Sequence, residues 1–163
     1  MLCLYQQAGL EFSELIEEVL SKKFNLPVIV GEKFQIPENT FNPLRAQYDA
    51  TNLIEALAGS LNKKCSYHLF IVDVDIYTPR FNFILGLANT QKHIALVSIH
   101  RLSRGGLLKN RLIKEVIHEL GHLWGLEHCT RSYCVMYFSN TVADTDHKGS
   151  DFCEACRRKL ERI

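Results

Sequence analysis

Three histidines near residue 120 have a spacing that suits zinc chemistry. His118 and His122 are four residues apart, so on a helix their imidazoles lie one above the other, about 6 Å apart along the axis. Both can then bind one ion in the tetrahedral geometry that zinc prefers. Gly125 permits a sharp turn that brings His128 back as a third neutral nitrogen ligand. The fourth position stays open for water or a carbonyl oxygen, as in catalytic zinc sites.

Glu119 lies beside the first of these histidines and points about 100° away from it around the helix. From there it cannot easily be a ligand, but it can take a proton from a water that zinc activates. A chance match to the five fixed positions of HExxHxxGxxH in 163 residues has a probability below about 10⁻⁴. The alternative is a surface helix with ordinary histidines. The pattern predicts a hydrolytic zinc centre with Glu119 as general base.

Four cysteines after the third histidine form two closely spaced pairs, Cys129 with Cys134 and Cys153 with Cys156. This spacing suits a closed four-thiolate zinc site, which leaves no position for water. Its role would therefore be to fold residues 129–163, which have little apolar periodicity of their own. The alternative is that these cysteines form disulfides or stay unpaired. His147 is a possible substitute for one of the four ligands.

The other two cysteines, Cys3 and Cys65, stand alone, and we interpret them as small buried apolar residues. The N-terminus shows no charged segment followed by an apolar one, so no secretory signal is expected and a reducing, cytoplasmic location follows. Disulfides are therefore not expected. A hyperthermophilic source would weaken that argument, because such organisms tolerate intracellular disulfides.

The elements that must position these residues follow from length and periodicity. A chain of 163 residues, 47% apolar and 23% charged, suits one globular domain. Helical periodicity is strongest just before and through the histidine motif, and Gly125 should end that helix. We expect helices over 11–23 (capped by Ser13), 50–61, 107–125 and 151–162, strands over 26–30, 67–77, 81–89 and 93–101, an irregular crossover over 35–48 and a loop over 129–149. Strands alternating with helices indicate an α/β fold with a small C-terminal subdomain.

The segment HELGHLWGLEHC, followed by Cys134, Met136 and the CxxC pair, resembles the archaemetzincin family of metzincin zinc peptidases. Sixteen residues separate Met136 from Cys153, one fewer than in the family pattern, which a loop can absorb. The resemblance implies a metzincin-like fold, in which a twisted mixed sheet packs with helices. It also implies one catalytic domain, with an upper subdomain of residues 1–128 and a lower one of residues 129–163.

The resemblance further implies two zinc ions per chain. The catalytic zinc would be held by His118, His122 and His128, and the structural zinc by Cys129, Cys134, Cys153 and Cys156. Met136 would form the methionine-containing turn beneath the three imidazoles. Its neighbour Tyr137 could reach the cleft and stabilise a tetrahedral intermediate.

The substrate implied by the resemblance is a peptide or protein, bound as an added strand along the edge of the sheet. The strand expected at 81–89, or its neighbour, would supply that edge. Endopeptidase and aminopeptidase action both stay open. An aminopeptidase needs an anchor for the substrate's N-terminus, and Asp144, Asp146 and Asp151 are candidates whose positions the sequence does not define.

Two other functions fit part of the pattern. Bacterial zinc proteins of ribosomal RNA maturation space three histidines similarly but lack the adjacent glutamate. Glu119, the cysteine pairs and a net charge of +1 favour the peptidase, so no nucleic-acid partner is expected. A latent or non-catalytic zinc-binding module is the other alternative. No apolar stretch is long enough to span a membrane, and we expect a monomer.

Overall fold

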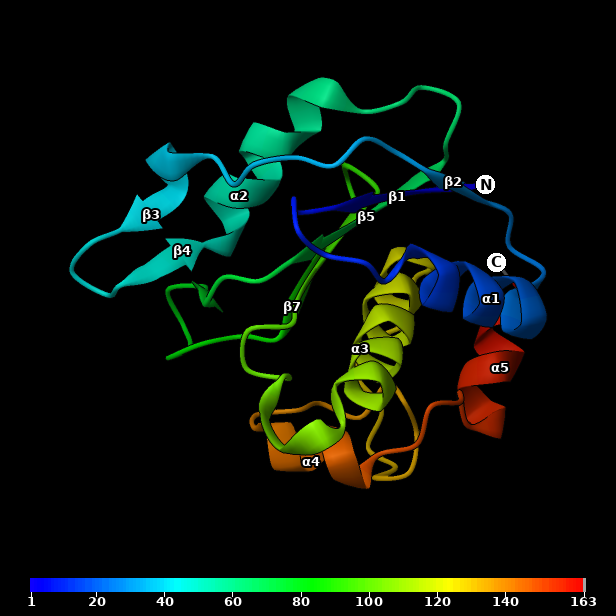
Figure 1. Cartoon of the computed structure of the whole chain (residues 1–163). Coiled ribbons are helices and arrows are strands. Elements are labelled where there is room, and N and C mark those ends of the chain that lie inside the picture. Colours follow the sequence, from blue (N-terminus) through cyan, green and yellow to red (C-terminus); the bar gives the residue numbers. More distant parts are fainter. Residues whose placement is uncertain (163) are drawn as a thin grey trace.

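The computed structural model describes residues 1–162 and contains two sheets (Figure 1). The larger sheet has five strands in the order β2-β1-β5-β8-β7. Three neighbouring pairs run parallel, and only β7 runs antiparallel to its neighbour β8. The sheet is therefore mixed, as expected, and β7 forms one free edge. Its strands are β1 (Leu2–Gln6), β2 (Val28–Val30), β5 (Tyr67–Val72), β7 (Gly86–Asn89) and β8 (Ile94–Ser98).

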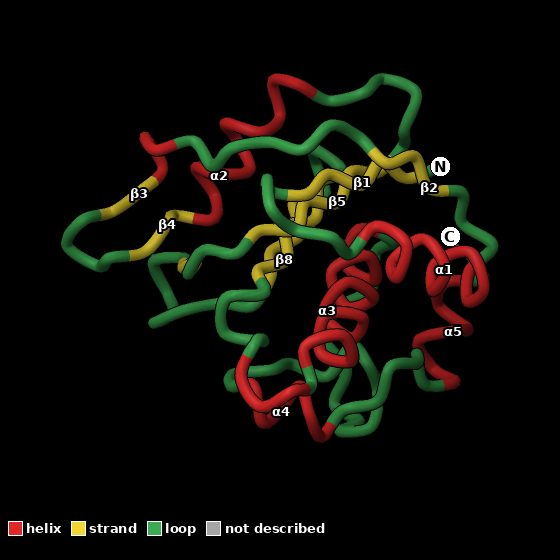
Figure 2. The backbone as a smooth tube through the Cα atoms, in the orientation of Figure 1, coloured by secondary structure: helices red, strands yellow, loops and turns green. Residues whose placement is uncertain are grey.

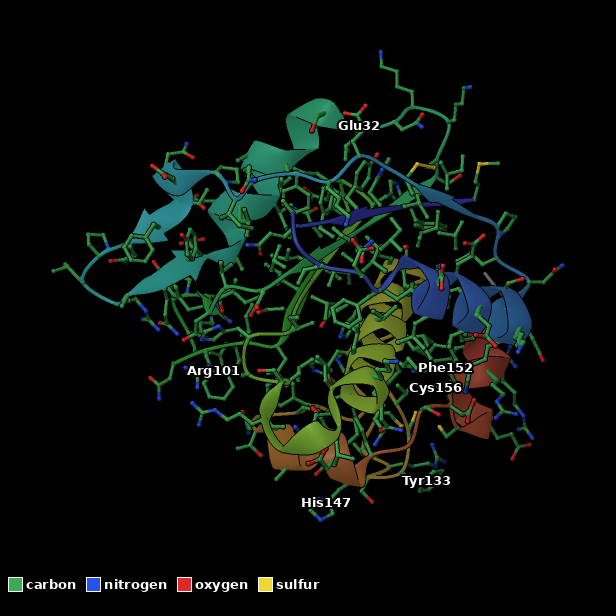
Figure 3. All side chains as sticks on the ribbon, in the orientation of Figure 1. Glu32, Arg101, Tyr133, His147, Phe152 and Cys156 are labelled. Carbon is green, nitrogen blue, oxygen red and sulfur yellow. A yellow bond between two sulfur atoms is a disulfide. The ribbon has the colours of Figure 1, made fainter. Side chains whose placement is uncertain are left out.

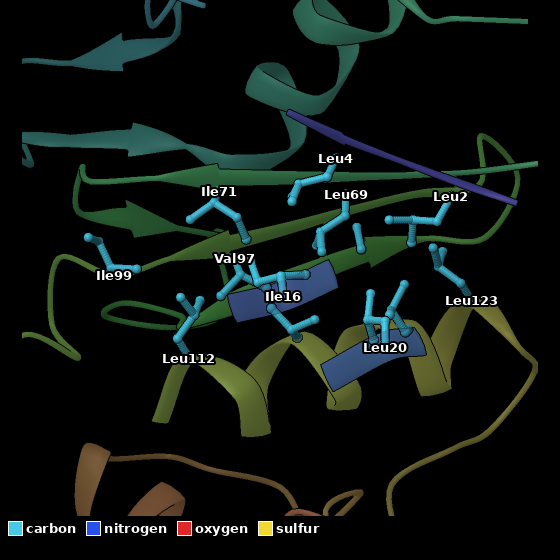
Figure 4. Close-up of a cluster of buried hydrophobic side chains, with 13 residues drawn as sticks. Leu2, Leu4, Ile16, Leu20, Leu69, Ile71, Val97, Ile99, Leu112 and Leu123 are labelled. Carbon is cyan, nitrogen blue, oxygen red and sulfur yellow. The ribbon is translucent and has the colours of Figure 1, made fainter. Parts of the chain in front are cut away.

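The central strands are buried on both faces because helices cover both. Along β1, Leu2 and Leu4 pack against α1 (Ser13–Phe24) and α3 (Leu108–Leu123), in the cluster shown in Figure 4. Cys3 and Tyr5 point the other way and pack against α2 (Ala50–Leu57). Figure 2 shows α1 and α3 together on one side of the strands and α2 on the other. The core thus holds α3, which carries the histidine motif, directly against the sheet.

The second sheet is small and holds the connection that precedes α2. It has the order β3-β4-β6, with β3 (Phe41–Asn42), β4 (Gln47–Asp49) and β6 (Ile76–Tyr77). In Figure 1, β3 and β4 project away from the larger sheet. Asp49 caps α2 by accepting hydrogen bonds from the amides of Thr51 and Asn52.

A third apolar cluster organises the C-terminal part below α3. Met136, Phe152 and the buried cysteines meet Ile117 of α3 there. Two short helices complete this part, α4 (Val142–His147) and α5 (Glu154–Leu160). The division into upper and lower subdomains at residue 128 stays a prediction. None of the helices in residues 1–162 combines the length and the apolar character that a membrane span needs.

Several expected elements differ from the structure. The predicted strand 26–30 is shortened to β2, which is half-buried to exposed because it lies at the sheet edge. The predicted strand 67–77 is divided into β5, which ends at Val72 in the larger sheet, and β6 in the smaller one, and between them Asp75 forms a two-pronged ion pair with Arg101. The crossover at 35–48 contains the β3-β4 pair. Ser13 begins α1 without capping it, and Gln6 Oε1 accepts the amide of Phe12 instead.

Two further differences concern the C-terminal part. The predicted loop 129–149 contains α4, which begins with a capping box between Thr141 and Asp144. The last helix begins at Glu154 rather than at 151, because Cys153 still has extended backbone. The long helix ends close to its predicted stop, since Gly125 has φ 85° and follows α3 in a Schellman motif.

The interpretation of Cys3 and Cys65 as unpaired residues was wrong, because they form a disulfide. Cys3 lies on β1 opposite His68 of β5, and Cys65 lies just before β5, so the parallel pairing of these strands brings the two cysteines together. Their Cα atoms are 5.6 Å apart, within the range of disulfides. The other four cysteines are free thiols.

Candidate active site

The three predicted zinc ligands converge at the C-terminal end of α3. His122 Nε2 lies 3.1 Å from His118 Nε2 and 3.2 Å from His128 Nε2. Two nitrogens on one tetrahedral zinc, each at about 2.05 Å, would stand about 3.3 Å apart. The Schellman turn carries His128 back, as Leu126 N donates to Gly121 O over 2.9 Å. The nitrogen spacing therefore fits a zinc ion.

Backbone carbonyls orient two of the imidazoles. His118 Nδ1 lies 2.8 Å from Val135 O, and His122 Nδ1 lies 2.8 Å from Leu126 O. Each Nδ1–H donates to its carbonyl, which leaves Nε2 free to bind a metal. Burial lowers the pKa of His122 and His128, and burial together with the nearby Lys148 lowers the pKa of His118 to about 2. All three rings are therefore neutral, as metal ligands must be.

Glu119 lies buried in the same cleft, beside the edge strand β7. A Cβ added to Gly86 would stand 2.6 Å from Glu119 Oε1. The carboxyl group therefore lies directly against the backbone of β7. Burial and the neighbouring carboxylate of Glu115 raise the pKa of Glu119 well above its ordinary value. The missing side chain at Gly86 is part of the site, and no sequence motif marked it.

Met136 lies under α3, against Gly121, the glycine between His118 and His122. A Cβ on Gly121 would stand 2.4 Å from Met136 Sδ, so only glycine allows this close approach. Met136 is fully buried, and its neighbour Val135 supplies the carbonyl that holds His118. Met136 O also accepts the amide of Cys129 over 2.9 Å. The methionine turn thus contacts both ends of the histidine motif.

A cleft of about 730 Å³ contains the three imidazoles and Glu119. Strand β7 forms one wall through Gly86, Leu87 and Ala88. Residues 81–89 were expected to supply the cleft edge, and part of that segment does so as β7. Most of the remaining lining is apolar, with the rings of Phe81, Phe83 and Phe138 among it.

Tyr137 does not belong to the lining of this cleft, where its neighbour Phe138 lies against His128 with ring centroids 4.8 Å apart. The three candidate anchors for a substrate N-terminus are also elsewhere. The Asp144 carboxylate accepts the amide of Thr141 in the capping box of α4, Asp146 pairs with Arg111, and Asp151 pairs with Lys23. The carboxylates that do line the cleft, besides Glu119, are Glu115 and Glu127.

The four C-terminal cysteines form a second cluster. Cys129 Sγ lies 3.8 Å from Cys153 Sγ, and Cys134 Sγ lies 3.8 Å from Cys156 Sγ. Sulfurs on one tetrahedral zinc, each at about 2.3 Å, would stand about 3.8 Å apart, whereas a disulfide requires about 2.05 Å. The donor set and spacing therefore fit zinc.

Hydrogen bonding favours thiolate at Cys153, whereas burial raises the pKa of Cys134 and of Cys156. Burial opposes ionisation of Cys153, but bonds from the backbone and thiol of Cys156 and from Cys134 and Cys129 lower its pKa to about 6. His147 is exposed and bonds to Ala143 O, so it is not part of this cluster. In Figure 3, His147 points outward while Cys156 and Phe152 lie together near α5.

One group of buried charges near the site was not predicted. Arg111, Lys114 and Glu115 lie on α3 and are nearly inaccessible to solvent, as is Lys148 after α4. Their only signal in the sequence is their position between apolar residues of the helical stripe. That signal is weak, because a helix normally exposes charges at such positions.

The chain is similar to known proteins in both sequence and fold. The family model described as peptidase family M54 matches residues 6–162. An archaemetzincin from Saccharolobus solfataricus is 33% identical over 158 residues, which cover 92% of this chain and 85% of the relative. One from Pyrococcus horikoshii is 52% identical over 102 residues, 58% of this chain. That match spans about half of the relative, 54% of its length.

Solved structures agree over nearly the whole chain. The crystal structure of an archaemetzincin from Methanopyrus kandleri has a TM-score of 0.89 at 34% identity, covering 99% of this chain and 93% of that one. An archaemetzincin from Archaeoglobus fulgidus, complexed with malonate, has a TM-score of 0.85 at 32% identity, covering 98% and 99%. A zinc-dependent peptidase from Methanocorpusculum labreanum has a TM-score of 0.87 at 27% identity, covering 98% and 100%.

Proposed function

The chain belongs to peptidase family M54, the archaemetzincins, and from this membership we propose that it hydrolyses peptide bonds at the three-histidine site. The family resemblance seen in the sequence and the metzincin-like α/β fold are thereby confirmed. The observation that carries the proposal is the convergence of three neutral imidazoles and the buried carboxyl of Glu119 in one cleft.

His118, His122 and His128 would hold the zinc ion through their Nε2 atoms. A bound zinc supplies a Lewis acid that polarises the substrate carbonyl and makes an attacking water more acidic. The carbonyls of Val135 and Leu126 keep two of the rings in the ligating tautomer. The chain's own contribution is therefore a set of ligands that needs little rearrangement.

Glu119 acts as the general base in this proposal. It takes a proton from the attacking water and passes it to the leaving amine. Burial and the neighbouring carboxylate of Glu115 raise its pKa in the metal-free chain, and the positive charge of a bound zinc would favour the ionised form that accepts the proton. The position of Glu119 against Gly86 keeps the carboxyl group in the cleft.

The free edge of β7 would bind the substrate as an extended strand, with main-chain hydrogen bonds that do not depend on the peptide sequence. The apolar lining on the cleft side of β7 would accept a large apolar side chain next to the cleaved bond. Cys129, Cys134, Cys153 and Cys156 would hold a second zinc, which folds the C-terminal part and takes no part in the reaction.

Digestion of a peptide library, read by mass spectrometry, tests this proposal. The parent chain should cleave peptides, and Glu119→Ala should keep the fold and its zinc but lose cleavage. Equal cleavage by both proteins would contradict the role of Glu119. A parent chain that binds zinc and cleaves nothing would favour the latent or non-catalytic alternative. The ends of the product peptides would also distinguish endopeptidase from aminopeptidase action.

A further inference from the structure

A buried ammonium group lies behind the candidate zinc site. Lys148 follows α4, and its side chain is 0% exposed. Its Nζ lies 2.9 Å from Glu115 Oε1, and the Glu115 side chain is 3% exposed. Thr145 Oγ1 donates to the same carboxylate oxygen over 2.9 Å. This lysine and glutamate therefore form a buried ion pair between α4 and α3.

The same ammonium group reaches the backbone around Met136. Lys148 Nζ lies 3.4 Å from Tyr137 O and 3.4 Å from His118 Nδ1. His118 Nδ1 in turn donates to Val135 O. The carbonyls on either side of Met136 are thus held by two neighbouring groups, His118 and Lys148. His118 is itself a residue of α3, and Lys148 is held to α3 through its ion pair with Glu115.

Other contacts determine where Lys148 stands. Its amide donates to Asp144 O and ends α4. Lys114 Nζ donates to Thr145 O and Asp146 O, and Arg111 forms a two-pronged ion pair with the Asp146 carboxylate. Lys114 and Arg111 of α3 therefore hold α4 in place. Lys148, which follows α4, extends from there toward the histidines.

Stability alone does not explain why Lys148 and Glu115, rather than two apolar residues, occupy this buried position. A buried ion pair is often no more stabilising than apolar side chains of similar volume. A lone ammonium beside a zinc ion would also repel it, whereas Glu115 makes the pair neutral. We propose that Lys148, paired with Glu115, is a positioning residue that holds the Met136 turn and His118 in the geometry that binds zinc. This inference rests on the proposed zinc site at the three histidines.

The test compares zinc affinity with stability in matched variants. Lys148→Met removes the ammonium group. Adding Glu115→Gln also removes the carboxylate charge that Lys148→Met leaves unpaired. Leu53→Ala is the control, because Leu53 is buried between α2 and the face of the sheet opposite α3. Zinc affinity of the histidine site is measured by competition with a chelator. Zinc at the four cysteines is counted separately by release with a thiol reagent, and unfolding midpoints are measured in urea.

The expected result separates the two readouts. Lys148→Met should weaken zinc binding at the histidines by about 10- to 100-fold, as loss of groups that orient ligands does, and should leave zinc at the cysteines in place. The double variant should regain stability over Lys148→Met without regaining zinc affinity. Leu53→Ala should lower the unfolding midpoint by leaving a cavity, while zinc affinity stays within about twofold of the parent, since it leaves the contacts of Lys148 and the histidines unchanged.

Four results would overturn the inference. Unchanged zinc affinity in Lys148→Met, or its full recovery in the double variant, would reduce the pair to a packing element. Failure of the double variant to fold would show that the pair serves folding. A parent chain that binds no zinc through its histidines would overturn both proposals, whereas one that binds zinc but cleaves no peptide would overturn only the proposed activity.

Discussion

Replacing Gly86 by alanine should impair catalysis without removing the metal. Gly86 does not have a positive φ, so its backbone accepts a side chain. The added Cβ would stand 2.6 Å from Glu119 Oε1, 2.8 Å from its Cγ and 2.9 Å from its Cδ. These contacts are too short, so either the carboxyl group or β7 must move. In either case Glu119 and β7, the strand proposed to bind the substrate, lose their relative position.

The size of the effect follows from these distances. Ordinary van der Waals contact begins near 3.4 Å, so Oε1 must move from 2.6 Å by about 0.8 Å. A misplacement of about 1 Å can cost about 100-fold in rate. We therefore expect kcat/KM to fall by about 100-fold, or about 2.7 kcal/mol in the activation free energy. The three atoms nearest to the new methyl group all belong to Glu119 and none to an imidazole, so we expect zinc binding to be unchanged.

The assay measures peptide hydrolysis and zinc content on the same preparation. Gly59→Ala is the matched control, because no atom lies within 4 Å of its added Cβ and its φ is not positive. The control should keep the parent kcat/KM. If Gly86→Ala cleaves as fast as the parent, the carboxyl group of Glu119 does not act from the position described here.

Three further predictions concern the metals, the disulfide and pH. Metal analysis should find two zinc ions per chain and one in Cys153→Ser, whereas one zinc and four reactive thiols in the parent would contradict the cysteine site. Cys65→Ser should lower the unfolding free energy in urea by about 4 kcal/mol, because the Cys3–Cys65 bond closes a loop with a sequence separation of 62; an unchanged midpoint would argue against the bond. Burial, with a smaller effect of Lys148, lowers the pKa of His118 to about 2. Since the unfolded state binds that proton near pH 6.5, the metal-free protein should lose stability as pH falls from about 6.5 toward 2. In His118→Gln that dependence should be weaker, and an equal slope in urea titrations at several pH values would contradict it.

The convergence of the three histidines was predictable because their relation in the sequence is local. His118 and His122 share a helix face, and Gly125 ends that helix, so spacing alone places three imidazoles near one another. The two cysteine pairs likewise carry the spacing of a metal site. The supporting residues were not predictable in this way. Gly86 comes from β7, far from the motif in sequence, and its role exists only through its contact with Glu119.

The errors in the fold have similar causes. Helix α4 was not predicted within the expected loop 129–149, because charged residues of α3 hold this short helix in place and it has no apolar stripe of its own. Asp75 follows the alternating pattern of a strand, but it lies between β5 and β6, where it forms an ion pair with Arg101. Cys3 and Cys65 meet only because β1 and β5 are neighbours, a pairing that local periodicity does not define.

The adjacency of His128 and Cys129 has a thermodynamic consequence. These neighbours belong to different ligand groups, so one peptide bond separates the two proposed zinc sites. Binding at the cysteines would restrict the chain at Cys129 and lower the entropy lost when His128 is ordered. The two ions would therefore load cooperatively, and linkage requires the coupling to be equal in both directions. Oxidation of the thiols would then weaken metal binding in the cleft, although no thiol touches it.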